Sequence, residues 1–139
     1  MSNVKAAVTE LMQLDPALSA LLPGGVYAKA EINPTMGDPN PFDAVGRVRP
    51  SALVRYEVAA ATGPRGRFDR QFVVIFFYDH AGLDDITAAL DRTRELLHEH
   101  RIGDGAYSLR HVDDVNDQYD DAILAYMHRS RYEVARRRN

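Results

Sequence analysis

Acidic residues are concentrated between Asp113 and Asp121, where five aspartates fall within nine residues. Closely spaced carboxylates are the ligands that Ca²⁺ prefers, so this segment is the first candidate for a metal site. A calcium loop needs a glycine at its sharp turn and a bidentate glutamate at its last position. Counted from Asp114, the glycine is missing and the last position is Ala125. We therefore predict a solvated acidic turn that holds no metal.

Two histidines lie close together in His98-Glu99-His100, a spacing that could suggest zinc. On a helix, side chains two residues apart point in nearly opposite directions, and no third ligand stands at metal spacing. We predict no zinc site, and we place both histidines in the last turn of a helix, where positive charge is favourable.

Catalytic and cofactor motifs are missing from the sequence. No serine lies in a nucleophile elbow, and there is no cysteine. Asp69 and Asp79 would be about 33 Å apart on an extended strand, too far to share a substrate. Gly103-Asp104-Gly105 lacks the third glycine of a phosphate loop. We expect no enzyme and no cofactor, although a pocket lined by His111 and Tyr107 with a perturbed pKa would favour a small ligand-binding protein or enzyme.

Arginines form two groups, one at residues 65–70 and one at residues 129–138. Arginine makes planar, bidentate contacts to carboxylates and phosphates. Three interpretations stay open for the basic tail at residues 135–139: a solvated tail, a nucleic-acid contact, or pairing with the acidic segment of a neighbouring copy. The net charge of −3 gives no overall attraction to nucleic acid or to anionic lipid.

The element that must organise the chain is the apolar run from Phe72 to Tyr78. Alternation places Val73, Ile75 and Phe77 on one face of a strand, and both faces are apolar, so both need cover. Helices predicted at 84–100 and 3–14 cover one face. Nothing in the sequence clearly covers the other, which predicts that Val73, Ile75 and Phe77, or the alternate set, lie near a subunit interface.

The remaining patterns complete a single α+β domain over residues 1–139, with a mainly antiparallel sheet and helices packed on one face. The other predicted elements are a short helix at 17–22 and strands at 26–28, 54–58, 107–111 and 122–134. No run approaches the ~18–20 apolar residues that span a bilayer, and the N-terminus does not resemble a signal peptide. We expect a protein without membrane contacts that is made in the cytoplasm.

A proline-rich loop interrupts these elements at residues 31–50, with four prolines and two glycines. A loop of twenty residues is long for a compact domain, so it is either a mobile surface loop or a docking arm. As a docking arm it would contribute Phe42, Arg47 and Arg49 to contacts between subunits.

The layout resembles the small tail-terminator (tail-completion) proteins of long-tailed bacteriophages. A short helix pair ends in Leu21-Leu22-Pro23-Gly24-Gly25-Val26-Tyr27, and the last strand alternates arginine and tyrosine in Tyr126-Met127-His128-Arg129-Ser130-Arg131-Tyr132. A proline-rich excursion, a hairpin and one amphipathic helix lie between them. The excursion is longer than is usual for such proteins.

The resemblance implies a hexameric ring that catalyses nothing, caps the full-length tail tube and joins it to the head connector. The expected partners are further copies of this chain, the tail tube protein and the head–tail connector protein, with DNA only passing through the ring. The expected location is the tail–neck region of a virion assembled in the host cytoplasm. We expect Arg129, Arg131 and the loop to contribute to subunit or tube contacts. The alternative is another neck component, such as a head-completion or connector protein.

Overall fold

The computed structural model describes residues 2–29, 31–33, 40–63, 66–102, 105 and 107–136. Within these ranges the chain forms three helices and six strands. In chain order they are α1 (Ser2–Leu14), α2 (Pro16–Leu21), β1 (Val26–Tyr27), β2 (Ser51–Gly63), β3 (Gly66–Asp79), α3 (Asp84–Leu97), β4 (Arg101–Ile102), β5 (Tyr107–Asp120) and β6 (Ala125–Arg136). None of the helices in the described ranges is long and apolar enough to cross a membrane.

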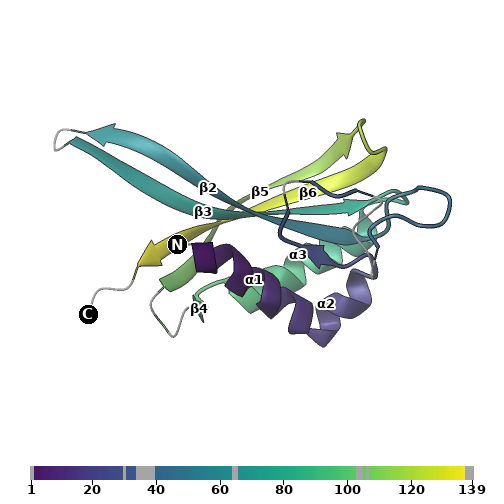
Figure 1. Ribbon diagram of the computed structural model, residues 1–139, viewed down its shortest axis with the longest axis horizontal. Helices are drawn as coiled ribbons and strands as arrows, with labels where there is room; N and C mark the ends of the chain where they lie inside the picture. The colour runs from purple at the N-terminus through teal and green to yellow at the C-terminus, as the bar shows by residue number, and fades with distance from the viewer. Residues whose placement is uncertain are drawn as a thin grey trace.

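All six strands join one sheet in the order β1-β2-β3-β6-β5-β4. β1 runs parallel to β2, and the other four pairings are antiparallel, so the sheet is mixed. Together with the helices this makes an α+β fold. Figure 1 shows the helices below the middle of the sheet, with the long β2–β3 and β5–β6 hairpins extending past them at opposite ends and curving away from them.

The main core lies between the sheet and the helices. Val73, Ile75 and Phe77 alternate along β3 and have no exposed area. They share one apolar cluster with Met12 of α1 and Ile86 of α3. These three side chains, expected near a subunit interface, are therefore covered by the chain's own helices, and a contact between subunits through β3 would have to use the opposite face.

A second, smaller apolar cluster lies at one end of that opposite face. Val48 and Ile32 of the proline-rich loop are buried there against Leu53 and Tyr78, and Phe42 packs against the cluster. The loop is held in place because His80 N–H donates to Val48 O at 2.9 Å. Neither a mobile surface loop nor a docking arm would contribute to the core, whereas the described part of this loop does. Residues 34–39 lie outside the described ranges.

The acidic segment expected to form a turn is instead a strand. Residues 113–120 belong to β5 and pair with β6, with register shifts between His111 and Asp113 and between Val115 and Gln118. The physical reason is cross-strand pairing: Asp113 faces Arg131 of β6, and the opposite charges stabilise an extended segment whose residues alone favour turns.

The segment after α3 also differs from the expectation. The helix ends at Leu97, and His98 has an extended backbone, so neither His98 nor His100 lies in the last helical turn. Residues 98–100 instead run beside β5: Glu99 N–H donates to Leu109 O at 2.7 Å, and His98 Nδ1 accepts from His111 N–H at 3.0 Å. Hydrogen bonds to a strand edge replace the last helical turn.

Candidate functional site

The side of the sheet turned away from the helices carries a regular array of charges, which we call the outer face. Strand register places its side chains in rows that cross four strands. The rows are Leu53–Phe76–Arg129–Val115, Arg55–Val74–Arg131–Asp113 and Glu57–Phe72–Glu133–Arg110. Arg70 lies on the same face of β3, two residues before Phe72.

Arginine side chains cover the apolar centre of the outer face. The guanidinium carbon of Arg131 lies 4.6 Å from the centre of the Phe72 ring, and that of Arg70 lies 5.1 Å away. Phe72 and Val74 are buried as a result. Arginine can do this because its stem is apolar and its planar head stacks on aromatic rings. The second face of β3 is therefore covered by the chain's own arginines.

The same arginines are paired with carboxylates. Arg70 makes a bidentate contact to Glu133 at 2.9 and 3.2 Å, and the hydrogen bond from Arg70 lowers the pKa of Glu133. Asp113 lies 2.7 Å from Arg131 and 3.6 Å from Arg129. Arg129 and Arg131, both predicted interface residues, thus meet around one carboxylate.

The predicted interface residues of the loop lie elsewhere. Arg47 pairs with Asp43 at 3.1 Å, and Arg49 donates to the carbonyl of Asn40 at 3.3 Å. Both contacts stay within the loop. Of the tail, Arg137 and Arg138 fall outside the described residues.

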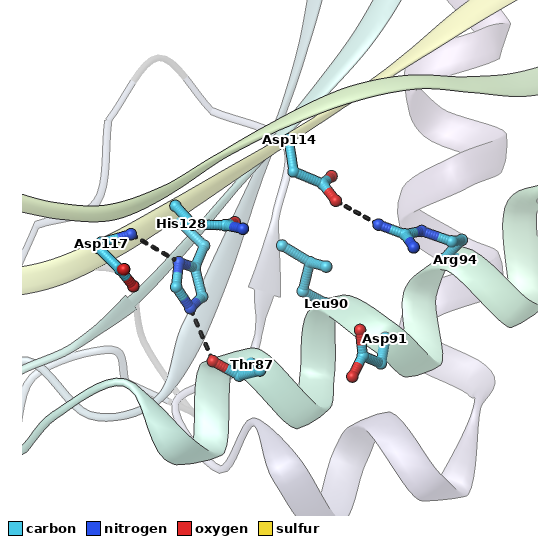
Figure 2. A pocket seen from close by; sticks show the side chains of 8 residues that line it. Thr87, Leu90, Asp91, Arg94, Asp114, Asp117 and His128 are labelled. Carbon is cyan, nitrogen blue, oxygen red and sulfur yellow. Dashed lines mark hydrogen bonds and ion pairs between the residues drawn. The ribbon is translucent and has the colours of Figure 1, made fainter.

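A polar pocket lies between α3 and the strands β5 and β6 (Figure 2). Its volume is about 220 Å³, and seven of its eight lining residues are polar. The lining residues are Thr87, Leu90, Asp91, Arg94, Asp114, Asn116, Asp117 and His128. Typical small-molecule sites are larger, roughly 300–1,000 Å³, and mostly apolar. His111 and Tyr107, the two residues that the ligand-binding alternative required, do not line this pocket.

Asp114 links three elements at one edge of the pocket. It accepts hydrogen bonds from Ser130 Oγ at 2.7 Å and His111 Nε2 at 2.8 Å, and it forms an ion pair with Arg94 of α3. Burial alone would raise the pKa of Asp114, but the hydrogen bonds and charges of these neighbours outweigh burial and lower it. The carboxylate is thereby held ionised as an anchor between helix and sheet.

His128 uses both ring nitrogens on the other side of the pocket. Nδ1 accepts from Asp117 N–H at 3.2 Å, and Nε2 lies 2.8 Å from Thr87 Oγ1. The Thr87 hydroxyl donates to Leu83 O, so it accepts from Nε2–H and the ring is neutral. Burial lowers the pKa of His128, and the carboxylates of Asp117 and Asp114 only partly offset it. The ring is engaged in structural hydrogen bonds, which is poorly suited to proton transfer.

The end of the β5–β6 hairpin is a feature that was not anticipated from the sequence. Tyr119, Leu124 and Tyr126 are 49%, 66% and 38% exposed there, and the two tyrosine rings meet edge to face with centroids 5.2 Å apart. The signal was present in the sequence as Ala122-Ile123-Leu124, apolar residues at a turn that lacks glycine and asparagine.

Within the described ranges, no group of three or more His, Asp or Glu is arranged to hold a metal ion.

Comparison with known proteins supplies the fold relationship. No protein-family model and no curated protein matches this chain. A solved structure, "Virion of native gene transfer agent (GTA) particle", contains a chain that superposes with a TM-score of 0.61 at 20% sequence identity. The match covers 94% of this chain and 90% of that chain. The two chains therefore share one fold over nearly their whole lengths.

Proposed function

We propose that this chain is a structural protein of a phage-like virion, and more specifically a tail terminator that forms a ring, caps the tail tube and joins it to the head connector. The observation that carries this proposal is the shared fold with a chain of the gene transfer agent virion, which extends over 94% and 90% of the two chains. The resemblance of the sequence to tail terminators supplies the finer role.

The chemistry of the described residues supports an assembly role over a catalytic one. In the polar pocket, Asp114 and His128 join the sheet to helix α3 through Arg94 and Thr87. On the outer face, Arg70 forms an ion pair with Glu133 across strands, and Arg129 and Arg131 form ion pairs with Asp113. A ring subunit needs two different surfaces that meet after a fixed rotation, and the outer face and the exposed end of the β5–β6 hairpin are two such surfaces.

The proposal places the protein in the tail–neck region, with copies of itself, the tail tube protein and the connector protein as partners. DNA would pass through the ring lumen without specific contacts. The net charge of −3 suits such a role, because tight binding to phosphates requires an excess of cations.

Light scattering after size-exclusion chromatography tests the ring directly, on the protein alone and mixed with tail tube subunits. We expect a mass of six copies, either alone or at the ends of tubes. Electron microscopy of particles that lack the protein should show overlong tails. A strict monomer that never joins tubes would contradict the proposal.

A second candidate is a head-completion or connector protein. The matching structure is that of a whole virion particle, and its name gives no position within that particle, so the shared fold does not separate the two roles. Particles lacking the protein separate the two roles, because loss of a head-completion or connector protein gives tailless heads with no change in tail length.

A further inference from the structure

We propose that the end of the β5–β6 hairpin of one copy docks on the outer face of the next copy and so forms the contact that closes the ring. This inference rests on the ring assembly proposed above. We call the docking element the hairpin tip and define it as residues 119–126, and the surface that receives it is the outer face.

The hairpin tip exposes more apolar area than a solvated turn requires. Tyr119, Leu124 and Tyr126 gather at one end of the hairpin, and the tyrosine rings are in contact with each other. Single exposed apolar residues are common on soluble proteins, whereas a group of them marks an interaction surface. Tyrosine is also enriched in the energetically dominant parts of protein interfaces.

Leu124 is held in a backbone conformation that disfavours its own side chain. Its φ is +53°, in the left-handed region where glycine and asparagine are the usual residues. A leucine there is destabilised relative to glycine, and burial within its own chain does not compensate, because the side chain is 66% exposed. Strain of this kind persists where function requires it, and here it presents an apolar side chain to the outside.

Charge indicates which surface receives the hairpin tip. Asp120 and Asp121 lie beside the apolar residues of the tip, which is therefore acidic. The outer face holds more cations than carboxylates: Arg55, Arg70, Arg110, Arg129 and Arg131 face Glu57, Asp113 and Glu133.

Arg55 is the cation on the outer face best placed to receive a carboxylate. It is exposed, lies 6.0 Å from the centre of the Phe76 ring, and has no ion pair with any other residue that the structure describes. An acidic tip with tyrosines and a leucine thus complements a surface of arginines stacked on phenylalanines.

The placement of the two surfaces favours a contact between copies. The β5–β6 hairpin extends beyond the helices and curves toward the outer-face side of the sheet (Figure 1). Tip and outer face are different patches, so a contact between them is heterologous and repeats from copy to copy until the rotation closes a ring.

Crosslinking tests the contact, since the chain has no cysteine of its own. Leu124→Cys and Arg55→Cys are made in separate proteins, mixed, assembled and treated with a short bismaleimide. We expect a crosslinked heterodimer, and only background when Val45→Cys, at a site 72% exposed on the proline-rich loop, replaces Leu124→Cys. Efficient Leu124→Cys homodimers would indicate contact between two tips and overturn the inference, as would equal crosslinking by the Val45→Cys control.

Assembly of a variant chosen to keep the fold gives the second test. Leu124→Gly removes the side chain and relieves the positive φ, so we expect an intact subunit that needs at least a tenfold higher concentration to form rings. Asp121→Arg should weaken assembly, and Arg55→Glu in the same chain should restore it. If Leu124→Gly assembles like the wild type, the docking contact is refuted while the ring stands. If the wild type forms no ring even with tubes, both proposals fall.

Discussion

Asp114→Asn should destabilise the protein more than any other single change in the polar pocket. The substitution keeps the size of the side chain but removes its charge, and Asp114 holds Arg94, His111 and Ser130 together. Hydrogen bonds to charged groups contribute about 1.5–3 kcal/mol each, and asparagine retains part of this set. We expect a loss of about 2–3 kcal/mol in the free energy of unfolding.

Urea unfolding at pH 7, followed by circular dichroism, measures this loss. For a domain of this size, about 1 kcal/mol corresponds to roughly 3–4 °C in Tm, so thermal melting should show a drop of about 6–12 °C. Asp91→Asn is the matched control. Asp91 lines the same pocket but is exposed, so its replacement should change stability by less than about 0.5 kcal/mol.

The pH dependence gives an independent check on the same reasoning. The pKa of Asp114 is lowered from the ordinary 3.8, so its contribution is fully present above that value and is lost as the pH falls through the folded-state pKa. The difference between wild type and Asp114→Asn should therefore be constant from neutral pH to about pH 5 and shrink in stronger acid. Equal stability of the Asp114→Asn and Asp91→Asn variants at pH 7 would refute the role of Asp114 as an anchor.

Three further predictions concern the core, a helix cap and a histidine. Ile75→Ala, at a site without exposed area, should lower the free energy of unfolding measured in urea by about 2–5 kcal/mol. Val45→Ala, at an exposed site, should lower it by less than about 0.5 kcal/mol. Asp15 caps α2 by accepting a hydrogen bond from Leu18 N–H, and it binds Arg92 at 2.7 and 2.9 Å. Asp15→Asn keeps a capping oxygen, whereas Asp15→Ala does not. The free energy of unfolding measured in urea should therefore be about 1 kcal/mol lower for Asp15→Ala than for Asp15→Asn. Burial lowers the pKa of His128 from 6.5, so wild-type stability should fall as the pH drops through 6.5 toward the folded-state value. The urea midpoint should therefore decrease less between pH 7.5 and pH 5 in His128→Gln than in the wild type.

The parts of the fold that could be predicted from sequence are those set by local pattern. The apolar run Phe72–Tyr78 has few conformations open to it other than a buried strand, and β3 contains it. Helix α3 follows from the spacing of Ile86, Leu90 and Leu97, although its last turn is replaced by hydrogen bonds to β5. The hairpin of β2 and β3 follows from the turn residues between two strand patterns.

Contacts between distant segments decided what could not be predicted. Aspartate and asparagine disfavour strands, so the sequence pattern predicts a turn at residues 113–121. The neighbouring β6, with Arg131 and Ser130 opposite Asp113 and Asp114, provides partners that stabilise the extended form. Alternation correctly placed Arg129 and Arg131 on one face of the last strand. The register with β3 then placed Arg129 opposite Phe76, and it placed Arg131 close to the Phe72 ring. The turn at the hairpin tip could not be predicted, because the positive φ of Leu124 contradicts the preference of its residue type.

The pairing of β3 with β6 has a consequence for folding. β2–β3 and β5–β6 are local hairpins that each form from neighbouring chain, whereas β3 and β6 join distant segments: Arg70 and Glu133, for example, are 63 residues apart in sequence. Non-local pairings of this kind form late, because closing a long loop costs entropy before contacts repay it. The helix-covered core contains residues of both β3 and β6, and the rows of the outer face run across this strand pair. A subunit therefore acquires its outer face only in the step that completes its core, so incompletely folded chains lack the surface on which the proposed docking contact depends.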